Sequence, residues 1–279
     1  MKKFFKTALF VALAAAILAG CGSGATTTGS QAEGNKASTL EAIKQRGTLI
    51  VGSSNDVPFA YIDKDTKQLK GIDAEIIQEI AKRLGIPKVE MKEIKFENLL
   101  VELNNKNIDM VTDGMYIKPE REKIAQFTHP WYKEGEGLVV RKDSTISGLE
   151  DLKDKVVGGQ KGTAFLEYIQ KMQQQGKVKE VKVFGSQAEL LLAINTDKID
   201  AGITDSATAA YTIQHDPTLN VKLVSPYTPV FQGTVAAAVR KEDTDLLEAV
   251  NKELDNLKRE GFVLKVLQKY GLGQDNMVE

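Results

Sequence analysis

The sequence has one cysteine, two histidines and no cluster of residues with the spacing of a metal site. Cys21 is the only cysteine among 279 residues, so the chain cannot form an intrachain disulfide. His129 stands beside Pro130, and His215 lies in "IQHDP", which we interpret as a surface turn. No glycine-rich stretch has the P-loop pattern. We therefore expect neither a metal site nor a cofactor.

The chain also lacks an excess of charge and a long apolar run in its body. It has 37 Lys and Arg against 38 Asp and Glu, a formal net charge of −1. Without a basic stripe, nucleic acid is not an expected partner. After the N-terminus, no apolar stretch approaches the roughly 20 residues that a membrane span needs.

The N-terminus "MKKFFKTALFVALAAAILAGC" has the pattern of an export signal. Three lysines precede an apolar run over residues 8–19, and small residues lead to Cys21. The run is too short for a spanning helix. Residues 18–21, "LAGC", resemble the lipobox of bacterial lipoproteins, which implies cleavage before Cys21 and lipid on its sulfur. We predict a signal peptide at 1–20; the alternative is a secreted protein with an unmodified cysteine.

Residues 21–39 are small and polar and predict a flexible tether between the membrane surface and the body. The body, from about Leu40 to Gly273, is long enough for two domains of ordinary size.

Apolar runs alternate with helical patterns through the first part of the body. In "GIDAEIIQEIAKRLG", Ile72, Ile76, Ile80 and Leu84 fall on one helical face, and Gly85 suits the helix end. We predict, in order, a strand at 49–51, a helix at 72–84, a strand at 89–94, a helix at 97–106, a strand at 108–117 and a helix from Pro119. This alternation indicates a parallel sheet with right-handed crossovers.

The pattern then restarts, and "NIDMVT" at 107–112 matches "KIDAGI" at 198–203 in form. Two α/β lobes of like construction follow from this repeat. We predict a short helix at 149–155, a strand through Val156 and Val157, a helix from about Ala164, a strand at 181–185, a helix at 186–198, a strand at 199–205, a strand at 235–243 and an amphipathic helix that ends at Gly261.

Several stretches, in this order and spacing, resemble the extracytoplasmic solute-binding proteins of ATP-driven importers, specifically the polar amino-acid group of family 3. They are "GTLIVGSSNDVPFAYID", "GIDAEIIQEIAKRLG", "NIDMVTDGMYIKPEREKIAQFTHPWY", "LVVRKDSTISGLEDLKDKVVGGQKGT", "KIDAGITDS" and "LKREGFVLKVLQKYG". The resemblance implies a two-lobed clamp of the type II periplasmic-binding-protein fold, each lobe a mainly parallel sheet flanked by helices. Lobe 1 would take residues 40–134 and 230–279, and lobe 2 residues 135–229. The chain would cross between lobes near Tyr132–Gly135 and Pro229–Gln232.

The resemblance also assigns ligand-binding roles. Arg121 falls where the family places the arginine that holds a ligand carboxylate, and a guanidinium near a helix N-terminus suits that task physically. In the alternative, Arg121 is an exposed arginine that pairs with a neighbouring glutamate. Thr163 and Gln160 border the turn "QKGT", which the family uses to meet the carboxylate, and Gly114 is carried over as a lining residue.

Asp205 in "GITDSA" matches the aspartate that binds the ligand's ammonium group. A carboxylate at an apolar strand end needs a cationic partner, either a ligand or a neighbouring lysine.

Tyr116 departs from the common pattern, in which a serine or threonine donates a second bond to the carboxylate. An aromatic residue here is similar to the ectoine-binding branch of the family, as is "SNDVPFAY". In that branch an acidic residue and aromatic faces hold a cationic ligand. The matching positions are Asp56, Phe59, Phe96 and Tyr116. The alternative is that the three aromatic residues only fill the core.

The resemblance implies a lipid-anchored, extracytoplasmic, monomeric binding component of an importer. It would capture a polar or basic amino acid, or a similar zwitterion, and deliver it to permease and ATPase subunits. Ectoine or betaine binding is an alternative. A dehydratase-like enzyme on the same fold is a further one, although the two histidines offer little support and we predict no enzymatic activity. A co-receptor role beside a membrane sensor also stays open.

Overall fold

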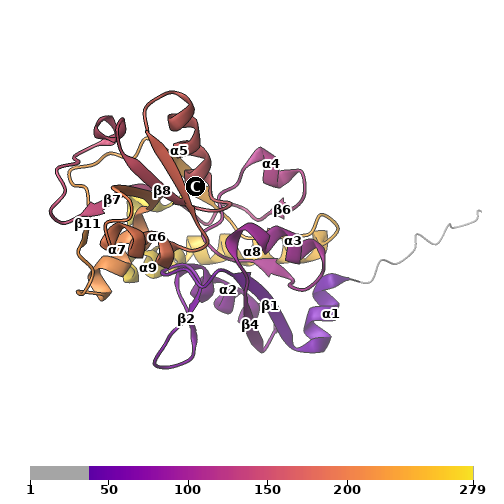
Figure 1. Cartoon of the computed structure of the whole chain (residues 1–279). Coiled ribbons are helices and arrows are strands. Elements are labelled where there is room, and N and C mark those ends of the chain that lie inside the picture. The colour runs from indigo at the N-terminus through magenta and orange to yellow at the C-terminus, as the bar shows by residue number, and fades with distance from the viewer. Residues whose placement is uncertain (1–37, 279) are drawn as a thin grey trace, which may run out of the picture. The chain divides into compact units, whose positions relative to one another are not determined.

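The computed structural model describes residues 38–278, in which two mixed sheets carry helices on their faces (Figure 1). The predicted signal peptide, Cys21 and all but the last two residues of the predicted tether lie outside the described residues. None of the helices within 38–278 is both long and apolar enough to cross a bilayer.

The first sheet has the order β4-β1-β5-β13-β6. Its strand β1 pairs in parallel with β4 and β5, and β13 pairs antiparallel with β5 and β6. The strands are β1 (Thr48–Ser53), β4 (Lys88–Glu93), β5 (Met110–Val111), β6 (Gln126–Phe127) and β13 (Ala238–Val239). A small hairpin, β2 (Tyr61–Ile62) and β3 (Leu69–Lys70), stands apart from it.

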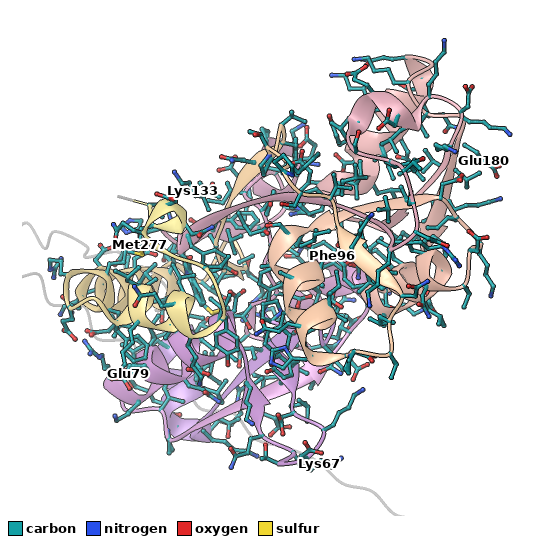
Figure 2. The ribbon with its side chains drawn as sticks, turned by 90° about the vertical axis from the view of Figure 1, so that its left-hand side faces the viewer. Lys67, Glu79, Phe96, Lys133, Glu180 and Met277 are labelled. Carbon is teal, nitrogen blue, oxygen red and sulfur yellow. The ribbon has the colours of Figure 1, made fainter. Side chains whose placement is uncertain are left out.

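The second sheet has the order β11-β7-β10-β8-β9, with β12 paired to the other end of β7. Its strands are β7 (Tyr132–Arg141), β8 (Val156–Gln160), β9 (Glu180–Phe184), β10 (Ala201–Asp205), β11 (Val221–Leu223) and β12 (Gln232–Val235). The strands β10, β8 and β9 are parallel, whereas β7 runs antiparallel to β10, β11 and β12. In Figure 2, Glu180 at the start of β9 lies far from Lys67 in the hairpin beside the first sheet.

Helices cover both sheets and connect their parallel strands. They are α1 (Thr39–Arg46), α2 (Ile72–Arg83), α3 (Leu99–Asn104), α4 (Pro119–Glu122), α5 (Ala164–Gln174), α6 (Gln187–Asn195), α7 (Ser206–His215), α8 (Thr244–Arg259) and α9 (Phe262–Lys269), with short 3₁₀ turns at Phe96–Asn98, Leu149–Leu152 and Gln274–Asn276. The expected two-lobed α/β architecture is confirmed, and each sheet is mixed because the strands that return from the other sheet enter antiparallel.

Helix α2 shows how the sequence dictates the packing. Ile72, Ile76 and Ile80 recur on one face and are all fully buried. Burying each such side chain contributes about 1.5–3 kcal/mol. Acidic residues in the first turn and basic residues in the last turn match the helix dipole, and Gly85 follows the helix with a φ of 76°.

The repeat in the sequence corresponds to equivalent hydrogen bonds in the two sheets. The Asp109 carboxylate accepts a bond from the backbone N–H of Ile50 at 2.8 Å, and the Asp200 carboxylate accepts one from Val156, also at 2.8 Å. Asp109 directly precedes β5 and bonds to β1, and Asp200 directly precedes β10 and bonds to β8, so each aspartate holds the start of its own strand against the neighbouring parallel strand.

The two predicted crossings lie side by side. Strand β7 pairs antiparallel with β12, with Gly135 opposite Gln232. A Cβ at Gly135 would lie 2.8 Å from Cβ of Pro229, so the glycine permits this close approach. The lobe boundaries proposed from the sequence stay a prediction.

Four elements differ from the sequence-based expectation. The strand expected over 108–117 contains only Met110–Val111, and the helix from Pro119 has only four residues. The strand expected over 235–243 is divided between β12 and β13. Helix α9 was not anticipated; it follows Gly261, whose φ is 74°.

Candidate functional site

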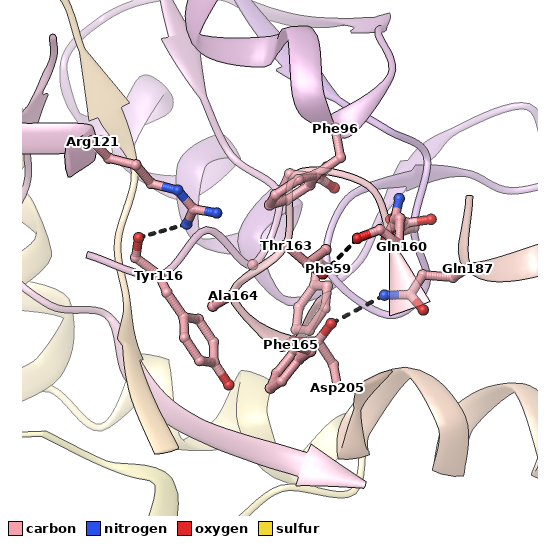
Figure 3. Close-up of a pocket in the computed structure, with 13 residues that line it drawn as sticks. Phe59, Phe96, Tyr116, Arg121, Gln160, Thr163, Ala164, Phe165, Gln187 and Asp205 are labelled. Carbon is pink, nitrogen blue, oxygen red and sulfur yellow. Dashed lines mark hydrogen bonds between the residues drawn. The ribbon is translucent and has the colours of Figure 1, made fainter. Parts of the chain in front are cut away.

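A pocket lies between the two sheets, and its walls come from both (Figure 3). Segments before β7 contribute Asp56, Phe59, Phe96, Asp113, Gly114, Tyr116 and Arg121, and segments from β8 to β10 contribute Gln160, Thr163, Ala164, Phe165, Gln187 and Asp205. All nine ligand-binding residues predicted from the sequence are among them. The structure brings them together, and their role in binding stays a prediction.

Arg121 is the only cationic side chain among the residues that line this pocket. Its Nη1 donates to the carbonyl oxygen of Tyr116 at 2.7 Å, and its Nη2 donates to that of Gly162 at 3.0 Å. The guanidinium also lies 5.5 Å from the centre of the Phe96 ring. Burial lowers the pKa of Arg121 to about 10, against nearby carboxylates that raise it, so the group stays charged at neutral pH.

The surroundings of Arg121 differ from the expectation in one respect. Helix α4 has four residues, too short for a substantial dipole at its N-terminus. The guanidinium itself must therefore supply most of the positive potential for an anionic group.

Asp56 and Asp113 form a carboxyl pair at one side of the pocket. The Ser54 hydroxyl lies between them, 2.7 Å from Asp56 Oδ2 and also bonded to Asp113. Burial raises the pKa of Asp56 to about 6, and burial together with the Asp56 charge raises the pKa of Asp113 well above its ordinary value. Two buried carboxylates this close cannot both ionise easily, so a cation brought between them would be bound strongly.

Asp205 ends β10 at the opposite wall and is 6% exposed. Its Oδ2 accepts a bond from Nε2 of Gln187 at 3.2 Å (Figure 3). Burial, followed by the charges of Glu134 and Asp56, raises the pKa of Asp205 well above its ordinary value. No lysine lines this pocket, so the lysine alternative for Asp205 has no candidate there.

Gln160 connects the two walls. Its Nε2 donates to Asp56 Oδ2 at 3.2 Å, across the pocket. Its Oε1 is buried without a hydrogen-bond partner in the described part of the chain. An unpartnered buried acceptor costs about 1–3 kcal/mol, so a ligand that offers an N–H here would gain affinity.

The Thr163 hydroxyl is already used in the structure. It donates to the carbonyl oxygen of Gln160 at 2.7 Å and accepts from the N–H of Leu166 at 3.2 Å, which caps α5. The hydroxyl would have to leave these bonds to meet a ligand carboxylate.

The three predicted aromatic residues line the pocket but are largely packed. Phe59 is 2% exposed, and a Cβ at Gly114, whose φ is 60°, would lie 2.7 Å from its ring. Tyr116 is 4% exposed, its ring meets Phe165 edge-on at 5.4 Å, and its hydroxyl donates to Glu134. Of the three rings, that of Phe96 lies against the guanidinium of Arg121.

The sequence reasoning missed Asp113, Ala164, Phe165 and Gln187, and also Glu134 behind the wall. Asp113 had a usable signal, since Thr112-Asp113 directly follows β5 as Thr204-Asp205 ends β10. Neighbouring parallel strands end at the same sheet edge, so this aspartate was predictable as part of the site.

The enclosed space is small. The cavity volume is about 20 Å³, close to what one water molecule requires. The walls contact each other outside the pocket as well, where the hydroxyl groups of Tyr61 and Tyr211 lie 2.8 Å apart. An amino acid therefore fits only after the walls move apart or their side chains rearrange.

Neither histidine lines the pocket. His129 is exposed and its ring nitrogen lies 3.0 Å from Asp255, and His215 stacks on Tyr211 with 4.0 Å between ring centres. Within residues 38–278, no group of His, Cys, Asp and Glu side chains has the arrangement of a metal site.

Comparisons with known proteins agree on one family. Residues 49–273 match the family described as bacterial extracellular solute-binding proteins, family 3. The glutamine-binding protein of Geobacillus stearothermophilus is 33% identical over 79% of this chain and 87% of its own length. An ancestral arginine-binding protein bound to arginine is 35% identical, with a TM-score of 0.73 over 81% of this chain and 99% of that chain.

One similar structure is connected with an enzyme. The ancestral amino acid-binding protein AncCDT-1, a precursor of cyclohexadienyl dehydratase, is 33% identical, with a TM-score of 0.74 over 84% of this chain and 99% of that chain. The two relatives above are named as binding proteins. With its family match over most of the described residues, the chain belongs to the bacterial extracellular solute-binding proteins of family 3.

Proposed function

We propose that this protein is the lipid-anchored binding component of an ATP-driven importer and that its ligand is a basic amino acid. The observation that carries the choice of ligand is the charge balance of the pocket. Asp56, Asp113 and Asp205 line it, and Arg121 is the one cation among the lining residues. A zwitterion with no net charge leaves this excess of carboxyl groups uncompensated, whereas a ligand with a second cationic group compensates it.

The ligand's groups have complementary partners. Its carboxylate replaces the carbonyl oxygens that now accept from Arg121, and its α-ammonium binds Asp205. Its side-chain cation lies near Asp56 and Asp113, where the free Oε1 of Gln160 accepts an N–H. Such a ligand contacts both walls and stabilises the closed arrangement, so it shifts the population toward closure.

The anchor and the partners complete the proposal. Lipid on Cys21 holds the body at the outer face of the cell membrane, and the body works as a monomer that delivers its ligand to permease and ATPase subunits. The sequence "LAGC" supports the anchor. Labelled palmitate incorporated into the unmodified chain, but not into a Cys21→Ala chain, tests it.

Two alternatives have some support. The aromatic residues Phe59, Phe96 and Tyr116 at the pocket favour ectoine or a betaine. The similarity to AncCDT-1, an amino acid-binding protein that is a precursor of cyclohexadienyl dehydratase, keeps an enzyme as the second alternative.

A calorimetric titration of the purified chain with L-arginine, L-lysine, L-glutamine, ectoine and glycine betaine tests the proposal. We expect arginine or lysine to bind most tightly, and NMR of the recovered ligand to show it chemically unchanged. Tighter binding of ectoine or glutamine would reject the basic ligand, and turnover of the ligand would reject a pure binding function.

A further inference from the structure

Glu134 is a buried carboxyl group that none of the above assigns to the site. It lies on β7 and is 2% exposed. Its Oε1 accepts from the Ser206 hydroxyl at 2.7 Å and from the N–H of Ala207 at 2.9 Å, both in the first turn of α7. Its Oε2 accepts from the Tyr116 hydroxyl at 2.9 Å. Three donors thus hold this carboxyl group in one position.

The fourth neighbour of Glu134 is the buried carboxyl group of Asp205, because Ser206 and Ala207, which bond to Glu134 Oε1, directly follow Asp205 in the chain. The charge of each carboxylate opposes ionisation of the other. We therefore expect the pair to keep one proton. Glu134 has three other donors and the N-terminus of α7, which favour its ionised form, so Asp205 is the group that holds the proton.

We propose that Glu134 is a positioning residue for the cationic end of the ligand: it keeps a proton on Asp205 in the ligand-free protein, and that proton leaves when the ligand's ammonium group takes its place. The proton passes to the solvent, and the ammonium N–H groups then donate to the ionised Asp205. Binding therefore releases a proton, and the affinity rises with pH while the ligand-free pair still holds it.

The other charged groups near Glu134 and Asp205 do not reverse the expected rise of affinity with pH. Those that act on Glu134, Asp205 or Tyr116 are Arg121 from α4, Asp56 from the segment after β1, Tyr116 itself, and Tyr132 and Glu136 from β7. The positive charge of Arg121 and the hydroxyl bond from Tyr116 favour ionised carboxylates, whereas the negative charges of Asp56 and Glu136 favour retention of the proton. Burial raises the pKa of Glu134 to about 7, so the pair holds a single proton above neutral pH and takes up a second one below it.

The first experiment needs no ligand. Carbon-13 NMR follows the Asp and Glu carboxyl groups of the ligand-free chain as pH is varied. We expect Glu134 and Asp205 to titrate in two well-separated steps. In Glu134→Gln the pKa of Asp205 should be lower by about one pH unit or more, because the negative charge of Glu134 is gone. Titration of both groups together in their ordinary range would overturn the proposal.

The second experiment counts protons during binding and rests on the proposed function, since L-arginine is the probe. Calorimetry near pH 8, where Glu134 and Asp56 are mostly ionised, should give a release of about one proton per arginine in buffers of different ionisation enthalpy. The number of protons released per arginine should fall by at least half in Glu134→Gln. Asp73→Asn removes another buried carboxyl group whose pKa is raised to about 6 but which does not line the pocket, and it should leave the count unchanged.

The two experiments separate the two proposals. If arginine does not bind, the proposed ligand is wrong, and the NMR titration still decides whether Glu134 and Asp205 share a proton. If arginine binds and Glu134→Gln releases as many protons as the unmodified chain, Glu134 has no such role and this inference is rejected. If Glu134→Gln does not fold, the two-step titration of the unmodified chain remains the deciding measurement.

Discussion

Replacement of Arg121 by alanine is the most direct test of how the pocket holds an anionic group. A charge-assisted hydrogen bond to a carboxylate contributes about 1.5–3 kcal/mol. Its loss corresponds to a fall in affinity of about tenfold to about 150-fold. The structure places the effect in the lower half of this range, because the guanidinium must first give up its bonds to the carbonyl oxygens of Tyr116 and Gly162.

Calorimetric titration with L-arginine at pH 7 measures the effect. Arg121→Lys keeps the charge but loses the planar pair of donors, so its affinity should lie between those of the unmodified chain and Arg121→Ala. Arg83→Ala is the control: Arg83 pairs with Glu79 and Glu260 at the surface and does not line the pocket, so its removal should leave the affinity unchanged. Unchanged affinity in Arg121→Ala would refute the carboxylate role.

Three further predictions concern pH, backbone conformation and closure. Burial raises the pKa of Asp73 to about 6, so between its ordinary pKa and pH 6 the folded state keeps a proton that the unfolded state has lost. The free energy of unfolding of the unmodified chain therefore falls as pH rises through that range. In chemical denaturation, Asp73→Asn should gain up to about 3 kcal/mol in free energy of unfolding relative to the unmodified chain between pH 4 and pH 7.5. Gly114→Ala should lower the free energy of unfolding by about 1–3 kcal/mol in urea, because φ at this position is 60° and the new Cβ would meet the Phe59 ring; an unchanged midpoint would contradict this. Tyr211→Phe removes the bond to the Tyr61 hydroxyl that joins the two walls outside the pocket, so the radius of gyration of the ligand-free chain should increase in X-ray scattering and return to its original value with saturating ligand.

Much of the fold was predictable because it depends on local pattern. The isoleucines of α2 and the strand β8 at Val156 are specified by periodicity and by short apolar runs. Helix α9 was not, because the glycine that ends α8 also begins a second amphipathic helix. The ten-residue strand β7 has buried glutamates at positions that a sequence analysis assigns to solvent.

The candidate site was predictable where a residue ends a strand, caps a helix or lies in its first turn, as Asp205, Thr163 and Arg121 do. Glu134 could not be found this way. It lies inside a strand, and its importance comes from a neighbour 71 positions further along the chain, Asp205, which only the tertiary structure brings into contact. Gln160 was predicted from its turn, but its free acceptor is visible only once its burial is known.

The pairing of β7 with β12 has a mechanical consequence. Glu136 accepts bonds from the backbone N–H groups of Val230 and Phe231. The crossing at Pro229–Gln232 is therefore hydrogen-bonded to the strand that carries the crossing at Tyr132–Gly135. Two strands joined in this way resist sliding and stretching, and they yield mainly by twisting. The opening of the protein should therefore follow a single rotational path, and a bulky residue at Gly135 would obstruct that path without touching the bound solute.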